Sequence, residues 1–233
     1  MQAKFQRDIR PGHEYNADFS APRGSSVVVD GDADADDTVK FIVKQVKKTL
    51  GQTARVAVKL RGRDLKDTCR KIWEFCYWNI QYQLDTPGIE EVESPDYIWS
   101  RRETDCDGYT TMISGILDNL DIAHKIRVAA YTGTWQHVYV IVPVDGDVKA
   151  AHDRKKNRGS YYAIDPVTDR FDYEAPYSDN FDTPVRPERI QKALAGLETI
   201  GAVLPDGIVL ATTDANGTRY GWDEKGTMYE IGV

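Results

Sequence analysis

The sequence predicts an α+β fold, because segments with helical periodicity fill its first half and strand-forming runs fill its second half. Apolar residues recur at helical spacing in three segments, 39–50, 64–80 and 106–120. β-branched and aromatic residues gather in two short runs, 135–142 and 161–164, and three more strand-like runs follow from residue 208. We therefore expect helices packed on an antiparallel sheet, with a small β-meander at the C-terminus.

Length and composition limit the class of protein. The chain has 233 residues, of which 41% are hydrophobic, which is enough for one sizeable core. A formal net charge of −7 argues against a general nucleic-acid binder, because neutralising phosphates requires clustered Lys and Arg. The first thirty residues lack a secretory signal, and the longest apolar run, 138–142, is too short to span a bilayer. Three cysteines fit a reducing compartment, so we expect a soluble cytoplasmic protein with no membrane partner.

Composition divides the chain into three parts. Residues 1–37 mix Pro, Gly and charge without periodicity and are predicted to be an N-terminal arm with an acidic leader. The aspartates of this leader lack the glycine and the distal glutamate of a calcium-binding loop, so we interpret them as solvated residues that favour the positive end of the next helix. Residues 38–187 are the predicted core, and residues 188–233 are a predicted C-terminal helix and β-meander.

The core is predicted to begin with a helix and a strand. The first apolar stripe ends near Gly51, which we interpret as a helix break. After it, Val56, Val58 and Leu60 alternate with polar or small residues, as in a short half-buried strand.

A second helix is predicted over 64–80. Cys69 and Cys76 lie on its apolar side, and their seven-residue separation is not a ligand spacing, so we interpret both as core thiols. Residues 85–102 then turn irregular, and the charged insert 145–160 is predicted to be an exposed loop.

The C-terminal part is predicted to hold a helix over 188–195 and an antiparallel meander. The Asn216-Gly217 pair separates two of the strand-like runs. Both residues tolerate positive φ, which makes the pair a strong hairpin signal.

Cys106 stands where a helix is expected to begin. The apolar residues of this helix start at Tyr109, and Asp105 and Asp107 flank the cysteine, as at a loop-to-helix junction near solvent. Free backbone N–H groups and the helix dipole at such a position stabilise a thiolate, the nucleophilic form of cysteine. Cys106 is therefore the predicted nucleophile. The alternative is a buried small hydrophobe, the common fate of a free cysteine.

His137 and Asp165 are the predicted base and its orienting carboxylate. His137 enters a strand rich in valine, and Asp165 ends the next short strand. If these strands pair antiparallel, the carboxylate can reach the imidazole. Each residue alone is ambiguous, since a strand histidine is more often structural and an aspartate before proline often caps a turn. His13, His124 and His152 lack a comparable setting, and His124 is interpreted as a surface residue.

Three motifs together resemble those of the transglutaminase-like cysteine protein superfamily, which has a papain-like core: Asp105-Cys106-Asp107, Gln136-His137-Val138 and Ala163-Ile164-Asp165-Pro166. The resemblance covers roughly residues 65–177 and extends to members from bacteriophages and prophages. It implies a helix bearing the nucleophile Cys106, packed on an antiparallel sheet that bears the base His137 and the orienting Asp165. Thr104 departs from the glycine that many relatives carry at this point.

This interpretation predicts a thiol enzyme that acts on amide bonds of a peptide or protein substrate, without cofactor or metal. The thiolate attacks the carbonyl, protonated His137 donates to the leaving amine, and water or an amine resolves the thioester. Hydrolysis by a peptidase or amidase is favoured over transamidation, because an amine acceptor needs its own binding site. Gln83, Trp99 and Gln136 are candidate oxyanion donors, together with the Cys106 backbone N–H.

The alternative is a non-catalytic phage structural or assembly protein that keeps the same fold. The arm at 1–37 and the tail at 188–233 favour it, because both exceed what a catalytic triad needs. Either segment could then bind a virion or assembly partner. The expected location is the cytoplasm of a bacterial host, or a virion.

Overall fold

The computed structural model describes residues 7–22, 26–29, 35–85, 90–187, 208–213, 219–223 and 228–232. The chain separates into two compact units, Met1–Pro187 and Glu188–Val233. The predicted helix at 188–195 lies outside the described residues, and the predicted division into arm, core and tail stays a prediction. None of the helices in the described ranges is long and apolar enough to cross a membrane.

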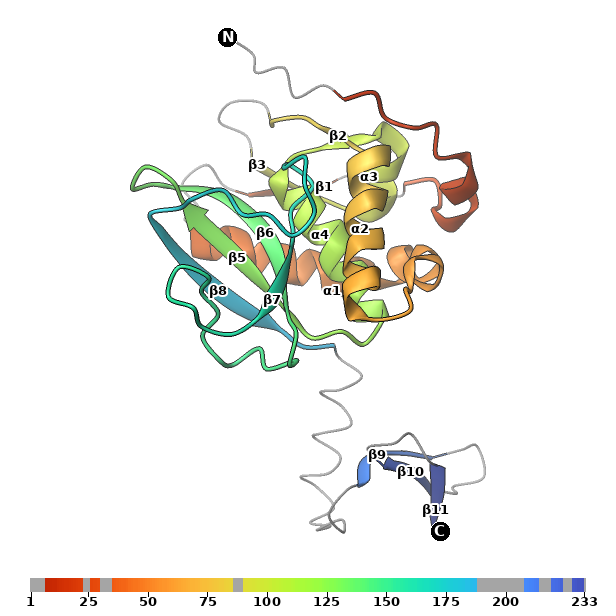
Figure 1. Ribbon diagram of the computed structural model, residues 1–233. Coiled ribbons are helices and arrows are strands. Elements are labelled where there is room, and N and C mark those ends of the chain that lie inside the picture. The colour runs from red at the N-terminus through yellow and green to blue at the C-terminus, as the bar shows by residue number, and fades with distance from the viewer. Residues whose placement is uncertain are drawn as a thin grey trace. The chain divides into compact units, whose positions relative to one another are not determined.

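A four-stranded antiparallel sheet forms one side of the first unit, in the order β7-β6-β5-β8 (Figure 1). Its strands are β5 (His124–Ala130), β6 (Trp135–Pro143), β7 (Tyr161–Ile164) and β8 (Asp179–Val185). The predicted antiparallel pairing of the two strands that carry the candidate base and carboxylate is confirmed, because Ile141 of β6 pairs with Ala163 of β7. The α+β class is confirmed with it.

α1 (Ala35–Leu60) is one helix of 26 residues, so the predicted break at Gly51 and the strand after it are wrong. Val56 and Leu60 are buried while Val58 is 72% exposed, which is the pattern of a helix face rather than of a strand. A Cβ at Gly51 would meet nothing within 4 Å. Glycine at an open position costs a helix about 1 kcal/mol relative to alanine, and the packing of the buried face outweighs that cost.

α2 (Leu65–Asn79) agrees with its prediction. The side chain of its N-cap, Asp64, accepts a hydrogen bond from the Asp67 backbone N–H at 2.8 Å. Cys69 and Cys76 are fully buried, as expected for core thiols.

α3 (Pro95–Arg101) lies in the segment that was predicted to be an irregular loop. Pro95 occupies its first turn, where a missing N–H costs nothing, and Ser94 is the N-cap residue. Two small sheets surround this helix in sequence. β1 (Ser26–Val29) pairs antiparallel with β3 (Glu90–Glu93), and β2 (Gln81–Tyr82) pairs parallel with β4 (Glu103–Thr104).

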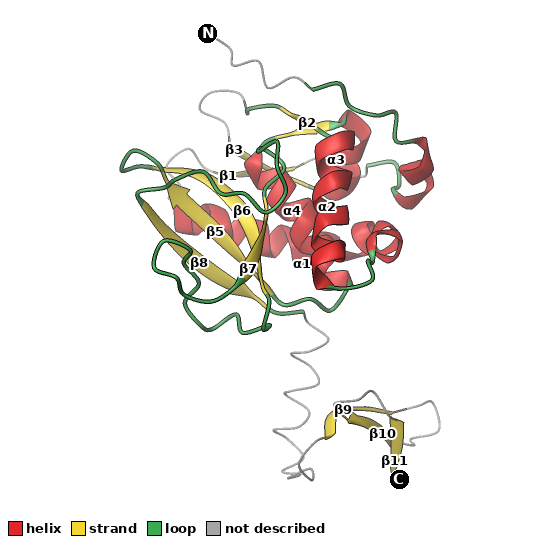
Figure 2. Cartoon of the chain, viewed as in Figure 1, coloured by secondary structure: helices red, strands yellow, loops and turns green. Residues whose placement is uncertain are grey.

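α4 (Cys106–Asn119) packs with α1 on one face of the large sheet, which we call the inner face. Figure 2 shows the helices gathered behind and beside this sheet. Because side chains alternate along a strand, each strand also supplies the opposite, outer face. The outer face carries a second cluster of buried residues under the loops that follow β6 and β7: Ala129, Tyr139, Ile141, Tyr161, Ala163 and Tyr177.

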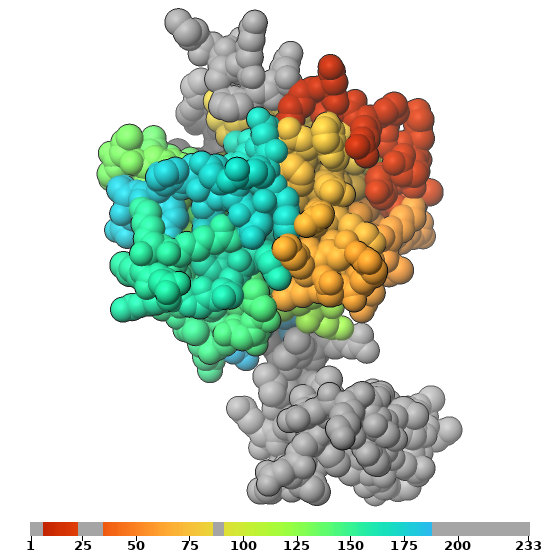
Figure 3. Space-filling model, in the orientation of Figure 1, coloured from red at the N-terminus to blue at the C-terminus, as the bar shows by residue number. Residues whose placement is uncertain are grey.

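Residues 7–22 of the predicted arm pack on the helical side of the first unit. They contain a short 3-10 helix, η1 (His13–Asp18), and in Figure 3 their red surface lies against the yellow and orange surface of α2. Phe19 stacks on Trp99 with ring centroids 4.8 Å apart, and Tyr15 meets Phe75 edge-on at 4.9 Å. These residues of the arm are therefore part of the core of this unit.

The second unit contains a three-stranded antiparallel sheet, which confirms the predicted meander. Its strands follow one another in the order β9 (Ile208–Thr213), β10 (Arg219–Asp223) and β11 (Met228–Gly232).

His124 is fully buried, so its interpretation as a surface residue is wrong. Its Nε2 lies 2.7 Å from Ser114 Oγ of α4, and its Nδ1 lies 2.9 Å from the Ile122 carbonyl oxygen. The neutral imidazole satisfies both contacts, because Nδ1–H donates to the carbonyl and Nε2 accepts from the hydroxyl. This pair ties α4 to the first residue of β5.

Burial lowers the pKa of His124 from 6.5 to about 4. Unfolded chains bind a proton at this residue below about pH 6.5, whereas the folded protein resists protonation until about pH 4. The free energy of unfolding therefore falls as the pH drops from 6.5 to 4, and His124 alone accounts for about 3 kcal/mol of that fall.

We expect His124→Gln to remove this contribution, so that urea denaturation between pH 7 and pH 4 shows a shallower loss of stability than in the wild type. His13→Gln, the same change at an exposed histidine, is the control and should keep the wild-type slope. Equal slopes in all three proteins would contradict the prediction.

Candidate active site

Cys106 is the first residue of α4 and shares an open pocket of about 580 Å³ with His137. The predicted helix start is confirmed. The side chain of the N-cap, Asp105, accepts hydrogen bonds from the backbone N–H groups of Asp107 and Gly108, both at 3.0 Å. The rest of the pocket comes from the start of α1, from α4, from β5 and from the turn and first residues of β6: Ala35, Thr38, Val39, Asp107, Val128, Gly133, Thr134, Trp135, Gln136 and Val138.

The first turn of α4 sits directly against the residue that precedes the Asp-Cys-Asp motif. A Cβ added at Gly108 would lie 1.8 Å from Thr104 Oγ1 and 3.2 Å from Ile98, so no other residue fits there without moving both neighbours. Thr104 in turn donates a short hydrogen bond of 2.5 Å to the buried Glu93. Thr104 is thus a packing partner of the helix that presents Cys106.

The pKa of the Cys106 thiol is raised well above 9, so the predicted lowering by the helix terminus is wrong for this structure. Burial is the largest cause, and the carboxylates of Asp107 and Asp105 add to it. The backbone N–H of Val138 hydrogen-bonds to the sulfur and opposes the shift. The thiol donates to Asp107 Oδ1 at 3.6 Å. At neutral pH Cys106 therefore holds its proton and needs a base to become a nucleophile.

His137 and Asp165 form a hydrogen-bonded pair, with Nε2 and Oδ2 2.9 Å apart. The Asp165 carboxylate is buried, and its other oxygen accepts from the Val167 backbone N–H at 3.1 Å. The Trp73 indole fixes the Asp165 main chain by donating to its carbonyl at 3.0 Å. A neutral His137 must carry its proton on Nε2 to donate to Asp165, so Nδ1 is its available base nitrogen.

The three predicted residues thus lie at one site, where His137 contacts Asp165 directly but does not hydrogen-bond to Cys106. Val138, whose N–H holds the sulfur, follows His137 directly in β6. No hydrogen bond joins the Cys106 thiol to the His137 imidazole among the described residues. Direct proton transfer between the two groups therefore needs a contact that this arrangement of the side chains does not contain.

Two tyrosines that the sequence did not single out lie at the same site. Burial raises the pKa of Tyr82, and the nearby Cys106, Asp105 and Asp165 raise it further. Burial also raises the pKa of Tyr131, with Asp165 as the next cause. Both phenols thus stay protonated. Tyr82 pairs with Thr104 across β2 and β4, and no pattern in the sequence signals that short parallel pair.

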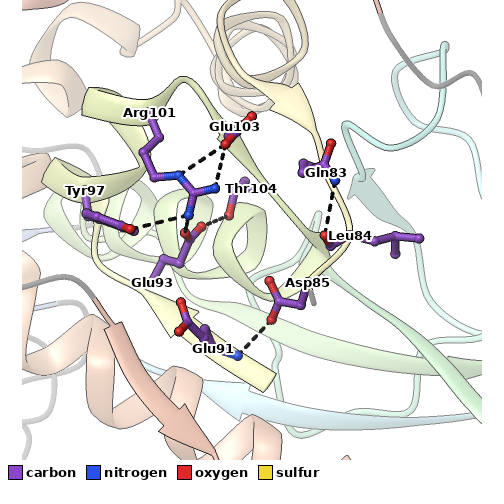
Figure 4. Close-up of a pocket in the computed structure, with 9 residues that line it drawn as sticks. All are labelled: Gln83, Leu84, Asp85, Glu91, Glu93, Tyr97, Arg101, Glu103 and Thr104. Atoms are coloured by element: carbon purple, nitrogen blue, oxygen red, sulfur yellow. Dashed lines mark hydrogen bonds and ion pairs between the residues drawn. The ribbon is translucent and has the colours of Figure 1, made fainter. Parts of the chain in front are cut away.

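Two of the candidate oxyanion donors lie elsewhere. Gln83 lines a second pocket, of about 410 Å³, and its amide donates to the Leu84 carbonyl (Figure 4). Trp99 donates to Asn16 of the arm at 3.2 Å. Gln136 does line the Cys106 pocket, where its Oε1 accepts from Thr132 at 3.2 Å.

The second pocket is lined by several acidic side chains, and two of them form ion pairs with Arg101. Figure 4 shows Arg101 reaching Glu93 and Glu103, at 3.2 and 2.5 Å, while Asp85 accepts from the Glu91 backbone N–H at 2.8 Å. The pocket lies beside β4 and holds none of the three predicted catalytic residues.

Among the described residues, Asp105, Cys106 and Asp107 place one ligand atom each within 4.8 Å of one another, a spacing that a metal ion accepts. Asp105 already accepts two backbone N–H groups, and Asp107 accepts from the thiol. The expectation of no metal stays a prediction.

A family model described as a transglutaminase-like domain matches residues 51–149. The matched stretch includes Cys106 and His137 and ends before Asp165. Comparisons with curated proteins and with solved structures gave no match. Over residues 51–149, from the middle of α1 to the turn after β6, the chain is similar to a transglutaminase-like domain.

Proposed function

We propose that this protein is a thiol-dependent acyl-transfer enzyme that acts on amide bonds of a peptide or protein through Cys106, His137 and Asp165. The observation that carries the proposal is the His137–Asp165 pair, 2.9 Å apart, in the same pocket as a cysteine at a helix start. The similarity to a transglutaminase-like domain over residues 51–149 supports it.

In this mechanism His137 acts first as a base. Its Nδ1 takes the proton from Cys106 as the sulfur attacks the amide carbonyl, and the imidazolium then gives a proton to the leaving amine. Asp165 stabilises the imidazolium and fixes its orientation. The Cys106 backbone N–H, at the start of α4, is the proposed donor to the developing oxyanion, because the next two N–H groups already donate to Asp105. Water then hydrolyses the thioester and returns the free thiol.

Hydrolysis is the proposed outcome rather than transamidation. Water is present at about 55 M, so an amine competes only where a site binds it beside the thioester and excludes water. The test offers glutamine-rich and glycine-rich peptides with and without a labelled primary amine, and follows both products by mass spectrometry. Amine incorporation that exceeds hydrolysis at millimolar amine would reassign the enzyme as a transamidase.

We expect iodoacetamide to label Cys106 while Cys69 and Cys76 stay unmodified in the folded protein. Both of those thiols are fully buried, and burial raises the pKa of Cys69 to about 12. Because the pKa of Cys106 is also raised, its labelling rate should climb through the alkaline range. The measurement is the extent of modification of each cysteine against pH, by peptide mass mapping. Equal labelling of all three would contradict the proposed nucleophile.

Asp107→Asn tests the cause of the raised pKa. Removing the carboxylate that accepts from the thiol should lower the pKa of Cys106 and so speed its labelling at pH 8. Asp145→Asn, at an exposed carboxylate outside the pocket, should leave the rate unchanged.

A non-catalytic binding role is the second candidate. The missing Cys106–His137 hydrogen bond and the raised pKa of the thiol favour it. On this alternative, a phage structural or assembly protein keeps the fold and has lost the chemistry. Absence of both thioester and hydrolysis product with every peptide, together with capture of an intact protein partner, would support it.

A further inference from the structure

A buried charge network covers the outer face of the large sheet and ends at the ring that packs beside the candidate base. Arg127 of β5 is fully buried. Its guanidinium binds Asp182 of β8 through two nitrogens, at 2.7 and 3.0 Å, and donates to Glu174 at 3.0 Å. Charge-assisted, bidentate contacts of this kind are among the strongest hydrogen bonds in proteins.

Glu174 is the branching point of this network. One oxygen, Oε1, accepts from Tyr139 at 2.7 Å, and the other, Oε2, accepts from Tyr161 at 2.6 Å. Burial raises the pKa of Tyr139, and Glu174 raises it further, so the phenol keeps its proton and its role as donor. The Glu174 carboxylate thus holds two tyrosine rings of neighbouring strands in place.

The Tyr139 ring in turn packs against His137. The ring centroids are 5.3 Å apart with planes inclined by 28°, and Tyr131 approaches the same imidazole at 6.3 Å. Asp165 holds Nε2 of the imidazole. The loop between β7 and β8 therefore reaches His137 twice, once directly through Asp165 at its start and once through Glu174 and Tyr139.

We propose that Glu174 is a positioning residue for His137, which it holds through the buried Tyr139 ring so that Nε2 stays on Asp165 and Nδ1 stays free to act as base. An imidazole held by one hydrogen bond can still rotate about that bond. A ring fixed against one of its faces removes that freedom and leaves one productive orientation. The proposal rests on the proposed function for the role of His137, but the placement of the imidazole is measurable without any substrate.

The charged and titratable groups that face His137 come from four elements. Tyr139 lies on β6, Tyr131 follows β5, and Asp165 follows β7. Cys106 and Asp107 line the shared pocket from α4. Among these groups Glu174 hydrogen-bonds to Tyr139, and its charge also raises the pKa of Tyr131. Tyr139, which alone of them contacts both Glu174 and His137, is the link to test.

Two matched variants separate positioning from a purely structural role. Tyr139→Phe removes the hydroxyl that ties the ring beside His137 to Glu174. Tyr161→Phe removes the other hydroxyl on the same carboxylate and leaves the Tyr139 contact intact. Each variant loses the hydrogen bond of one hydroxyl to Glu174, and Tyr161→Phe also loses an acceptor for Arg127 Nη1 at 2.9 Å. The free energy of unfolding of Tyr161→Phe should therefore fall at least as far as that of Tyr139→Phe, so a loss of stability alone cannot produce an effect confined to Tyr139→Phe.

The first measurement is the tautomer of His137 in the full chain labelled with ¹⁵N-histidine, with His137→Gln identifying its signals. We expect one dominant Nε2–H tautomer in the wild type and in Tyr161→Phe, and a mixture of tautomers in Tyr139→Phe and in Glu174→Gln. Identical His137 signals in the two tyrosine variants would overturn the proposal, because Glu174 would then serve only the charge network with Arg127 and Arg154.

The second measurement is peptide hydrolysis by the same proteins. Tyr139→Phe should lower kcat by about 10-fold to 100-fold, the cost of misplacing a catalytic group by up to an ångström, with KM unchanged. Tyr161→Phe should stay within about twofold of the wild type, because His137 keeps its support. If the His137 tautomers differ between Tyr139→Phe and Tyr161→Phe while the wild type hydrolyses no peptide, the positioning role is upheld and the proposed function is rejected.

Discussion

Cys106→Ala should lower kcat/KM for peptide hydrolysis by about 10⁴-fold or more, because the attacking atom of the proposed mechanism is lost and the oxyanion and substrate contacts alone give little rate. The measurement is product formation from the most active peptide of the glutamine-rich and glycine-rich panel, under single-turnover conditions. The wild type should also show a covalent acyl adduct on Cys106 by intact mass, and the variant should show none.

Cys69→Ala is the matched control, since it removes the same atom from a thiol that is buried in α2. Its activity per folded molecule should equal that of the wild type. Hydrolysis that survives Cys106→Ala at more than a hundredth of the wild-type rate would reject the nucleophile, whatever the labelling experiment gives.

Arg127→Met should strongly destabilise the first unit. The substitution roughly keeps the length of the side chain but removes the buried cation that contacts both Asp182 and Glu174. Each carboxylate keeps one more distant cation, Lys125 for Asp182 and Arg154 for Glu174, both at 3.5 Å. Breaking a buried ion pair in this way costs about 3–5 kcal/mol. The midpoint of urea denaturation, measured by tryptophan fluorescence, should fall accordingly.

Lys40→Met provides the comparison, because Lys40 also pairs with two carboxylates, Asp36 and Asp37. Those groups are exposed, so water screens their attraction and the variant should keep nearly the wild-type midpoint. A similar small shift for Arg127→Met would show that the network on the outer face is dispensable for folding.

Strong local patterns predicted several elements of the fold correctly. α2, α4 and β6 were each found because one periodicity continued without interruption. α1 was misread at Gly51, where an exposed glycine has no structural consequence. β8 was missed because its sequence, DNFDTPV, is polar and contains a proline, and its pairing with β5 is a tertiary contact.

The candidate site was predictable at the level of residue identity. Cys106 and His137 line one pocket, and each could be picked out because it lies at or near the start of an element with a clear periodicity. Their electrostatics could not be predicted, because the pKa of Cys106 depends on burial and on how Asp105 and Asp107 fold around the sulfur. The same holds for His124, whose burial depends on a helix packed behind its strand.

The docked arm has a consequence for the order of events during synthesis. Phe19 packs on Phe75 and Trp99, and the Arg102 guanidinium donates to the Pro11 carbonyl at 2.7 Å. The ribosome makes the arm several seconds before it makes these partners, at about 5–20 residues per second. Until α3 leaves the exit tunnel, Phe19 has no complete binding site. The arm must thus wait for α3 before it reaches its native contacts, and its aromatic side chains are open to chaperones in the interval.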